Sequence, residues 1–166
     1  MNTSFVAILM GSDSDLPVLQ STIDVLKSLG IQHEVKITSA HRTPSATHAY
    51  VKDADARGCG VFIAAAGLAA HLAGTVAGLT LKPVIGIPLD AGGLGGMDSL
   101  LSTVQMPGGI PVACVAIGKA GAKNAAYLAA QILATADEGL AKRIAEDRET
   151  NANTVIAKDA ELQAKL

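Results

Sequence analysis

Two short polar segments carry residue types that could hold an anion and move a proton. Residues 11–15 read GSDSD, and residues 39–44 read SAHRTP. In the second segment His41, an imidazole that titrates near neutral pH, stands beside Arg42, a guanidinium that stays charged. This segment is therefore suited to acid–base chemistry next to a bound phosphate or carboxylate.

The GSDSD segment allows two interpretations. Gly11 permits a tight turn, the hydroxyl of Ser12 and backbone N–H groups can receive a phosphate, and Asp13 or Asp15 can bind ribose hydroxyls. Alternatively, Ser14 or Asp15 merely caps the helix that follows. The residues alone leave both interpretations open. Since the segment matches neither GxGxxG nor a Walker sequence, it does not indicate a dinucleotide or a nucleoside triphosphate.

A third segment, residues 65–74 (AAGLAAHLAG), consists almost entirely of small residues. Such a loop can bring its backbone amides close to a flat ligand. On the residues alone, however, close helix packing is the simpler interpretation, with His71 as a core histidine. Glycine-rich stretches at 92–96 and 106–111 also suggest close backbone approach. The sequence contains no HExxH, no Ser-His-Asp order and no metal-ligand spacing, and we assign no role to His33 or His48.

Composition narrows the class of protein. The 166 residues are 49% hydrophobic and carry a net charge of −2 without a basic block, which favours one globular domain and argues against duplex nucleic acid or membrane binding. Cys59 and Cys114 are far apart, and the N-terminus lacks a basic, apolar targeting segment, so we expect a cytoplasmic protein. Aromatic residues make up only 2%, so we expect subunit contacts to add stability.

Apolar runs and helical periodicities alternate along the chain. Strands are predicted at 5–10, 34–38, 61–64, 83–88 and 112–117. Helices are predicted from Pro17 to Gly30, from Pro44 to Gly58, at 98–105, at 123–136 and from Glu138 onward. This alternation predicts a doubly wound parallel sheet whose ligands bind beyond the carboxyl ends of the strands. We expect one domain spanning 1–166, with an α/β core over 1–136 and a C-terminal helix over 137–166.

Five motifs in order resemble one family, the N5-carboxyaminoimidazole ribonucleotide mutases, or class I PurE proteins. They are GSDSD at 11–15, SAHRTP at 39–44, AAGLAAHLAG at 65–74, DSLLSTVQMPGGIPV at 98–112 and AIGKAGAKNAAYLAAQIL at 116–133. The resemblance extends from residue 5 to about residue 148. Five ordered motifs are far more specific than any one of them.

The resemblance implies a flavodoxin-like three-layer α/β/α sandwich, a homo-octamer, and neither a metal nor an organic cofactor. It implies that N5-carboxyaminoimidazole ribonucleotide and 4-carboxy-5-aminoimidazole ribonucleotide are interconverted in purine biosynthesis, with His41 shuttling the proton. Ser12, Asp15 and Arg42 would hold the ribose phosphate. The implied substrate-binding set is Gly11, Ser12, Asp13, Asp15, Ser39, Ala40 and Arg42, and near the carboxylate Ala66, Gly67, Ala70, His71 and Leu72.

Physical chemistry is consistent with that reaction. Breaking the N–CO₂ bond leaves an electron-rich aminoimidazole and CO₂, which must be recaptured at ring carbon C4 in a dry pocket. One histidine can protonate the leaving nitrogen and remove the C4 proton. The sequence departs from the family at Leu68, where glycine is usual, and at Ala73, where proline is usual.

Two other functions remain open, and two kinds of protein contact are expected, one between subunits and one with a partner enzyme. Class II members of the family carboxylate aminoimidazole ribonucleotide directly, and they carry Lys in place of Arg42 and lack the AAHL element. A non-catalytic nucleotide-binding module would have no need for His41 beside Arg42. We expect subunit contacts at residues 124–134 and near Met106, and a transient hand-over of substrate from the ATP-dependent synthetase that makes it.

Overall fold

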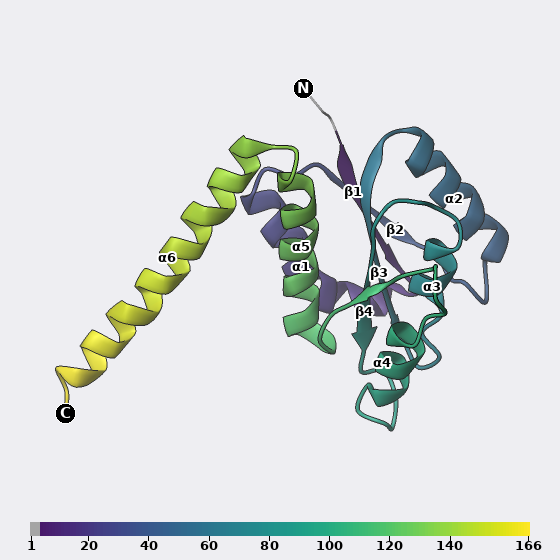
Figure 1. The fold of residues 1–166 in the computed structure, drawn as a ribbon. Coiled ribbons are helices and arrows are strands. Elements are labelled where there is room, and N and C mark those ends of the chain that lie inside the picture. Colours follow the sequence, from purple (N-terminus) through teal and green to yellow (C-terminus); the bar gives the residue numbers. More distant parts are fainter. Residues whose placement is uncertain (1–3) are drawn as a thin grey trace.

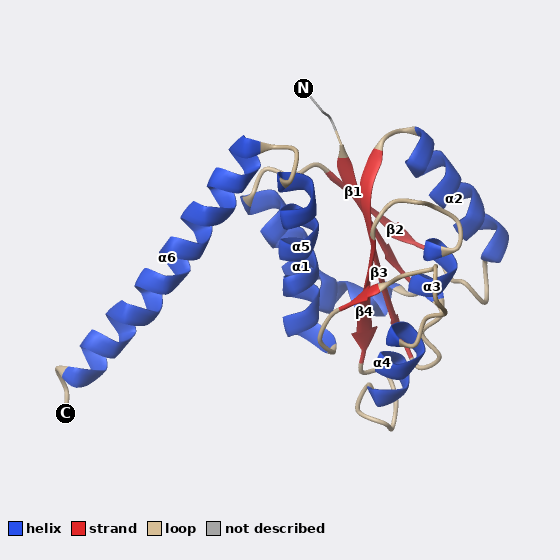
Figure 2. Ribbon diagram, in the orientation of Figure 1, coloured by secondary structure: helices blue, strands red, loops and turns tan. Residues whose placement is uncertain are grey.

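The computed structural model describes residues 4–166 and contains a five-stranded sheet in which all paired strands are parallel (Figures 1 and 2). The strands are β1 (Phe5–Met10), β2 (His33–Ile37), β3 (Cys59–Gly67), β4 (Val84–Leu89) and β5 (Ala113–Cys114). Their order is β2-β1-β3-β4-β5. The chain therefore changes direction across the sheet between β1 and β3, and the loops after these strands diverge there to leave a crevice.

Helices cover both faces of the sheet, which confirms the predicted three-layer fold (Figure 2). They are α1 (Leu16–Ser28), α2 (Pro44–Ala56), α3 (Leu72–Ala77), α4 (Met97–Val104), α5 (Gly118–Ala134) and α6 (Glu138–Gln163), with a short 3-10 turn, η1 (Asp13–Asp15). Helices α1 and α5 lie together on one face. Helices α2, α3 and α4 lie on the other face (Figure 1).

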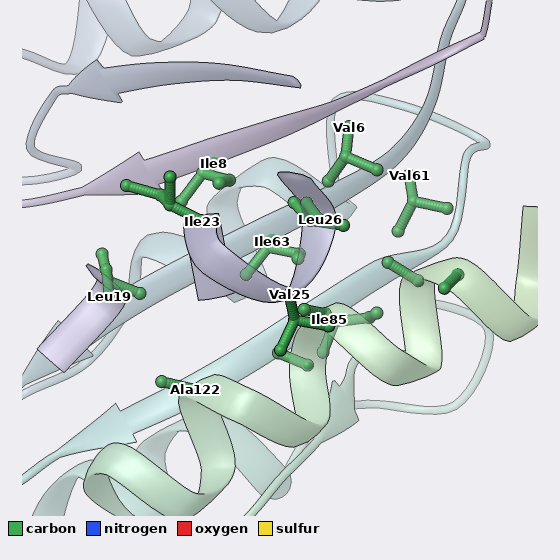
Figure 3. Close-up of a cluster of buried hydrophobic side chains, with 14 of the residues drawn as sticks. Val6, Ile8, Leu19, Ile23, Val25, Leu26, Val61, Ile63, Ile85 and Ala122 are labelled. Carbon is green, nitrogen blue, oxygen red and sulfur yellow. The ribbon is translucent and has the colours of Figure 1, made fainter. Parts of the chain in front are cut away.

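The larger core lies between the sheet and the α1–α5 layer. Figure 3 shows alternate strand residues such as Val6 and Ile8 of β1 and Ile63 of β3 pointing toward Leu26 of α1 and Ala122 of α5. These side chains are buried because β1 and β3 are covered by helices on both faces. A strand in this position has apolar residues throughout instead of an alternating pattern, as predicted for residues 5–10.

The opposite core has fewer residues and combines both phenylalanines of the chain with several alanines. Ala7 and Leu9 of β1 and Phe62 of β3 pack against Val51 of α2 and Val76 of α3. The small residues of this layer let α3 approach the sheet closely, so the loop that precedes α3 is held directly above the strand ends.

The structure revises several predicted boundaries. Strand β3 runs to Gly67, so residues 65–67 belong to the sheet, because they pair with β4 on one side while Ala65 also pairs with Met10 of β1. Strand β5 is shorter than the predicted 112–117, since it is an edge strand that pairs only with β4. Helix α5 begins at Gly118 instead of residue 123. Its first small residues, predicted to be loop, are helical because the helix packs closely against α1.

Helix α6 projects away from the rest of the subunit (Figure 1). Only Leu140 and Ile144 of this helix are buried. The alanines at 125, 126, 129 and 130 of α5 lie in the subunit's own core, so these four are not available for the predicted subunit contact at 124–134. Within residues 4–166 we find no helix that is both long and apolar enough to span a membrane. The expectation for the N-terminal segment falls partly on residues 1–3, outside the described residues.

Candidate active site

A pocket of about 480 Å³ lies where the loops after β1, β2, β3 and β4 meet. Its lining residues come from all four loops: Gly11, Ser12, Ser14, Asp15, Ser39, Ala40, His41, Arg42, Ala66, Gly67, Leu68, Ala69, His71, Leu72 and Ala91. The structure therefore brings together three segments that are far apart in the sequence. The carboxyl ends of the strands, where the fold class places a ligand, are the ends that form this pocket.

Two of the predicted site residues lie outside the pocket lining. Asp13 is exposed and accepts a hydrogen bond from the Ser12 hydroxyl (3.2 Å). Ala70 is buried, and its N–H donates to Ser102 Oγ on α4 (2.9 Å). Asp13 thus contacts a lining residue, Ser12, whereas Ala70 connects the loop after β3 to α4.

Four lining residues were absent from the predicted set. They are Ser14, Leu68, Ala69 and Ala91. Ser14 belongs to the GSDSD motif and Ala69 to the small-residue loop, so motif membership could have included both. Ala91 opens the glycine-rich stretch after β4. The sequence did indicate Ala91 by its position just after a predicted strand, because the loops that follow strands form the ligand site in this fold class.

The loop after β1 is fixed by a capping box. Ser12 Oγ accepts the N–H of Ser14 (3.3 Å), and Asp15 Oδ2 accepts the N–H of Ser12 (3.2 Å). Ser12 therefore caps the turn η1 with Asp15 as its partner, while α1 begins after Asp15 without a side-chain capping bond. Burial raises the pKa of Asp15 above its ordinary value, although the backbone N–H groups of Ser12 and Gly11 and the charge of Arg42 oppose that shift.

The loop after β2 is held by hydrogen bonds within the SAHRTP motif. Thr43 Oγ1 accepts the N–H of Ser39 (2.9 Å), and Ser39 Oγ accepts the N–H of Arg42 (3.1 Å). Pro44 opens α2 as predicted, but the Thr43 hydroxyl bonds to Ser39 instead of capping that helix. The guanidinium of Arg42 donates to the Gly11 carbonyl (2.6 Å), so the loops after β1 and β2 are joined at the pocket.

His41 and His71 meet across the pocket. His41 Nε2 and His71 Nδ1 lie 2.7 Å apart, and the two rings are edge-on with centroids 4.8 Å apart. At this distance one ring nitrogen carries a hydrogen and donates it in a hydrogen bond, and the other ring nitrogen is the acceptor. His71 is exposed, which overturns its interpretation as a core histidine on residues alone.

The wall opposite the polar loops is built from small residues. A Cβ on Gly67 would overlap the side chain of Ala91, so the loops after β3 and β4 fit together only with glycine there. Leu68, the next residue, has a positive φ of 57°. Over residues 4–166, no group of three or more His, Cys, Asp or Glu side chains is placed to hold a metal ion.

Comparisons with known proteins show which family this chain resembles. The AIR carboxylase family matches residues 5–154. The N5-carboxyaminoimidazole ribonucleotide mutase of Bacillus subtilis is 51% identical over 157 residues, covering 95% of this chain and 97% of that protein. The mutase of Escherichia coli K12 is 48% identical, covering 93% and 92%. The crystal structure of Treponema denticola PurE superposes with a TM-score of 0.87 at 33% identity, covering 96% of this chain and 98% of that one.

Proposed function

The chain belongs to the AIR carboxylase family, and we propose that it acts as an N5-carboxyaminoimidazole ribonucleotide mutase with His41 as general acid and base. It is an isomerase of purine biosynthesis that transfers a carboxylate from the exocyclic nitrogen of the substrate to ring carbon C4. The observation that carries the proposal is one pocket in which His41 and Arg42 face a wall of small, uncharged residues.

The polar side of the pocket suits the ribose phosphate. Arg42 provides a permanent charge, and the Ser12 hydroxyl and the Asp15 carboxylate provide a donor and an acceptor. The bond from Arg42 to Gly11 holds the guanidinium over the loop after β1, where a phosphate would lie. We propose that these three side chains bind the ribose phosphate and thereby place the imidazole ring toward His41.

The small-residue side suits the migrating carboxylate. His41 would donate a proton to the exocyclic nitrogen as the N–CO₂ bond breaks and its electron pair returns to nitrogen. The ring then attacks CO₂ through C4, and His41 removes the C4 proton to restore aromaticity. Ala66, Gly67 and Leu72 offer neutral CO₂ no strong interaction, while their backbone can orient the carboxylate.

Neither alternative function accounts for the site as well. Direct carboxylation would use the same ring chemistry, but the relatives that are about half identical to this chain are named as mutases. A passive nucleotide-binding module would need the arginine and the serines. It would not need an imidazole pair at 2.7 Å within the same pocket.

We further propose that the protein forms a homo-octamer in the cytoplasm and that residues 1–166 fold as one domain. We also propose that the synthetase that makes the labile substrate hands it over in a transient contact. Two observations support assembly: a long helix that leaves the subunit, and a core of aliphatic residues and alanines with Phe5 and Phe62 as its aromatic residues. Both described cysteines are free thiols, in keeping with a reducing compartment.

The decisive assay compares two substrates with purified protein. The proposal expects rapid formation of 4-carboxy-5-aminoimidazole ribonucleotide from N5-carboxyaminoimidazole ribonucleotide. It expects much slower formation from aminoimidazole ribonucleotide plus bicarbonate at the same concentration. The opposite preference would identify a direct carboxylase, and nucleotide binding without turnover of either would identify a binding module.

The His41→Asn variant tests the role of the imidazole. Both histidines are exposed, so His41→Asn should keep the fold and bind nucleotide, while its kcat falls roughly 10²–10⁴-fold, as expected for a lost general acid and base. The matched control is His71→Asn, which removes the other ring of the pair and should lose less. If His41→Asn turns over normally while His71→Asn is inactive, His71 is the proton-transfer group.

A further inference from the structure

Three threonine hydroxyls form a connected network beneath the loop that carries His41. Thr38 follows the last residue of β2, Thr47 belongs to α2, and both are buried. Their Oγ1 atoms lie 2.7 Å apart, and Oγ1 of Thr43 lies 3.3 Å from that of Thr38. A buried hydroxyl without a partner opposes folding, so the two buried threonines depend on each other.

The network ends on the peptide groups of the loop. Thr47 Oγ1 lies 3.3 Å from the Ser39 carbonyl oxygen and 3.1 Å from the Thr43 carbonyl oxygen. The Thr43 hydroxyl lies 3.2 Å from the same Ser39 carbonyl oxygen. Each hydroxyl has one hydrogen to donate. In either direction of the Thr38–Thr47 bond, the last hydrogen of the network therefore reaches a carbonyl of this loop.

The Ser39 peptide begins the turn that presents His41. Ser39 Oγ accepts the N–H of Arg42, so a rotation at Ser39 would move both ends of the turn. The side chain of Arg42 has an independent anchor, because its guanidinium donates to the Gly11 carbonyl. Within residues 4–166, the ring of His41 has one hydrogen-bond partner, His71. The direction of the His41 ring therefore depends strongly on the backbone at Ser39.

We propose that Thr47 is a positioning residue for His41, which acts through the Ser39 peptide without touching the substrate. This inference rests on the proposed mutase function. Thr47 is 0% exposed and does not line the pocket. Displacing a catalytic group by about 1 Å can lower turnover roughly 10²-fold, whereas the ribose phosphate would still meet the anchored Arg42. Loss of the Thr47 hydroxyl should therefore lower kcat and leave KM nearly unchanged.

Steady-state kinetics of two Thr47 variants test the role of the hydroxyl. Thr47→Val removes the hydroxyl but keeps the shape of the side chain, and its kcat should fall roughly 10–100-fold with little change in KM. Thr47→Ser keeps the hydroxyl and should recover most of the kcat.

Thr22→Val is the matched control. Thr22 is also 0% exposed, and its hydroxyl donates to the Ala122 carbonyl (2.7 Å) in the opposite core layer. Removing this hydroxyl should lower stability by an amount comparable to Thr47→Val while kcat stays at the wild-type value. A loss of kcat that comes only from a weakened core would appear in both variants.

A measurement without substrate separates positioning from the reaction itself. In protein labelled with ¹⁵N in its histidines, the ring nitrogen shifts report the bond between His41 and His71, with assignment by His41→Asn. Wild type and Thr22→Val should give the same shifts. Thr47→Val should move the His41 shifts toward those of an unpaired imidazole.

Wild-type kcat in Thr47→Val would overturn the inference, as would an equal loss in Thr22→Val or no recovery in Thr47→Ser. If Thr47→Val fails to fold, the double variant Thr38→Val with Thr47→Val replaces both buried hydroxyls, which is less costly than leaving one unpaired. It should show the same fall in kcat, and wild-type kcat there would also overturn the inference. Failure of the proposed function looks different, because wild type would then form no product while the histidine shifts would still respond to Thr47→Val.

Discussion

Asp15 shows how a residue that we propose to bind the substrate can oppose the stability of its own fold. Its carboxylate is half-buried, accepts the Ser12 N–H and lies near Arg42. Burial nevertheless raises its pKa above its ordinary value, which means that folding makes ionisation less favourable. A side chain that would be more stable uncharged, but is placed beside an arginine in a pocket, is better suited to binding a ligand than to supporting the fold.

Asp15→Asn should therefore weaken substrate binding without destabilising the protein near neutral pH. The sign follows from the raised pKa: the ionised Asp15 reduces stability once the pH rises through the interval above its ordinary pKa of 3.8, and the neutral amide does not. The expected result is a higher KM with an unchanged or higher thermal midpoint at pH 7. The midpoint difference between variant and wild type should shrink below that interval.

A midpoint for Asp15→Asn clearly below that of wild type at pH 7 would contradict this prediction. It would mean that the capping bond to Ser12 contributes more than ionisation opposes. Measuring both proteins with saturating substrate analogue gives a control, because ligand binding should then stabilise wild type more than the variant.

At the level of the elements, one glycine determines how closely α4 approaches the sheet. A Cβ on Gly86 of β4 would overlap the side chain of Thr103 on α4 and lie 2.9 Å from Cγ1 of Val112. It would also lie 3.2 Å from the Cβ of Ala73 on α3. Strand β4 is thus enclosed by α3, α4 and the chain entering β5, and no space remains for a methyl group.

Gly86→Ala should destabilise the protein by about 1–3 kcal/mol, the usual effect of overpacking a core. Its matched control is Gly93→Ala, since a Cβ there meets nothing within 4 Å and the residue lacks a positive φ. The control should change stability by no more than about 0.5 kcal/mol. Denaturant unfolding of the three proteins at one concentration measures both. Equal stability of the two variants would show that α4 can move away from the sheet.

Local sequence patterns predicted a helix or strand well where the segment is uniformly apolar or clearly capped. They predicted poorly where pairing with neighbouring strands determines the conformation. The first strand and the C-terminal helix begin where predicted, because residues 5–10 are continuously apolar and Asp137 caps the helix from Glu138 onward. Residues 65–67 looked like loop, since alanine and glycine have no strand preference of their own. Pairing with the neighbouring strands determines their conformation.

The same distinction applies to the site. His41 and Arg42 could be predicted from the sequence because their chemistry is unusual at a strand end. His71 was ambiguous without the family resemblance, since its partner is 30 residues away in the chain. Leu68 lines the pocket because the loops after β3 and β4 fit together, which residue types do not reveal, whereas the position of Ala91 directly after a strand was a usable signal.

At the level of the whole molecule, α6 is the element that the isolated subunit leaves without a role. Its first three turns are anchored, through Leu140 and Ile144, a bond from Arg143 to the Leu29 carbonyl, and a bond from the Tyr127 hydroxyl of α5 to Asp147 (2.7 Å). Val155 and Ile156 lie further along and are 68% and 66% exposed. Most of the stability of a helix in a protein comes from packing one of its faces, and the exposed apolar residues on the far half of α6 indicate that this half packs against another subunit.

We therefore expect wild type to be an octamer at micromolar concentration, and the double variant Val155→Glu with Ile156→Glu to dissociate. Burial of an aliphatic side chain is worth about 1.5–3 kcal/mol, so two charges in a contact repeated in every subunit should shift the assembly strongly. Light scattering coupled to size exclusion measures the mass. The control, Asn153→Glu, adds charge at an exposed polar position of the same helix and should leave the octamer intact. A monomeric wild type would refute the octamer, whereas an octameric double variant would place the subunit contacts elsewhere, such as the exposed Met97 and Leu101 of α4.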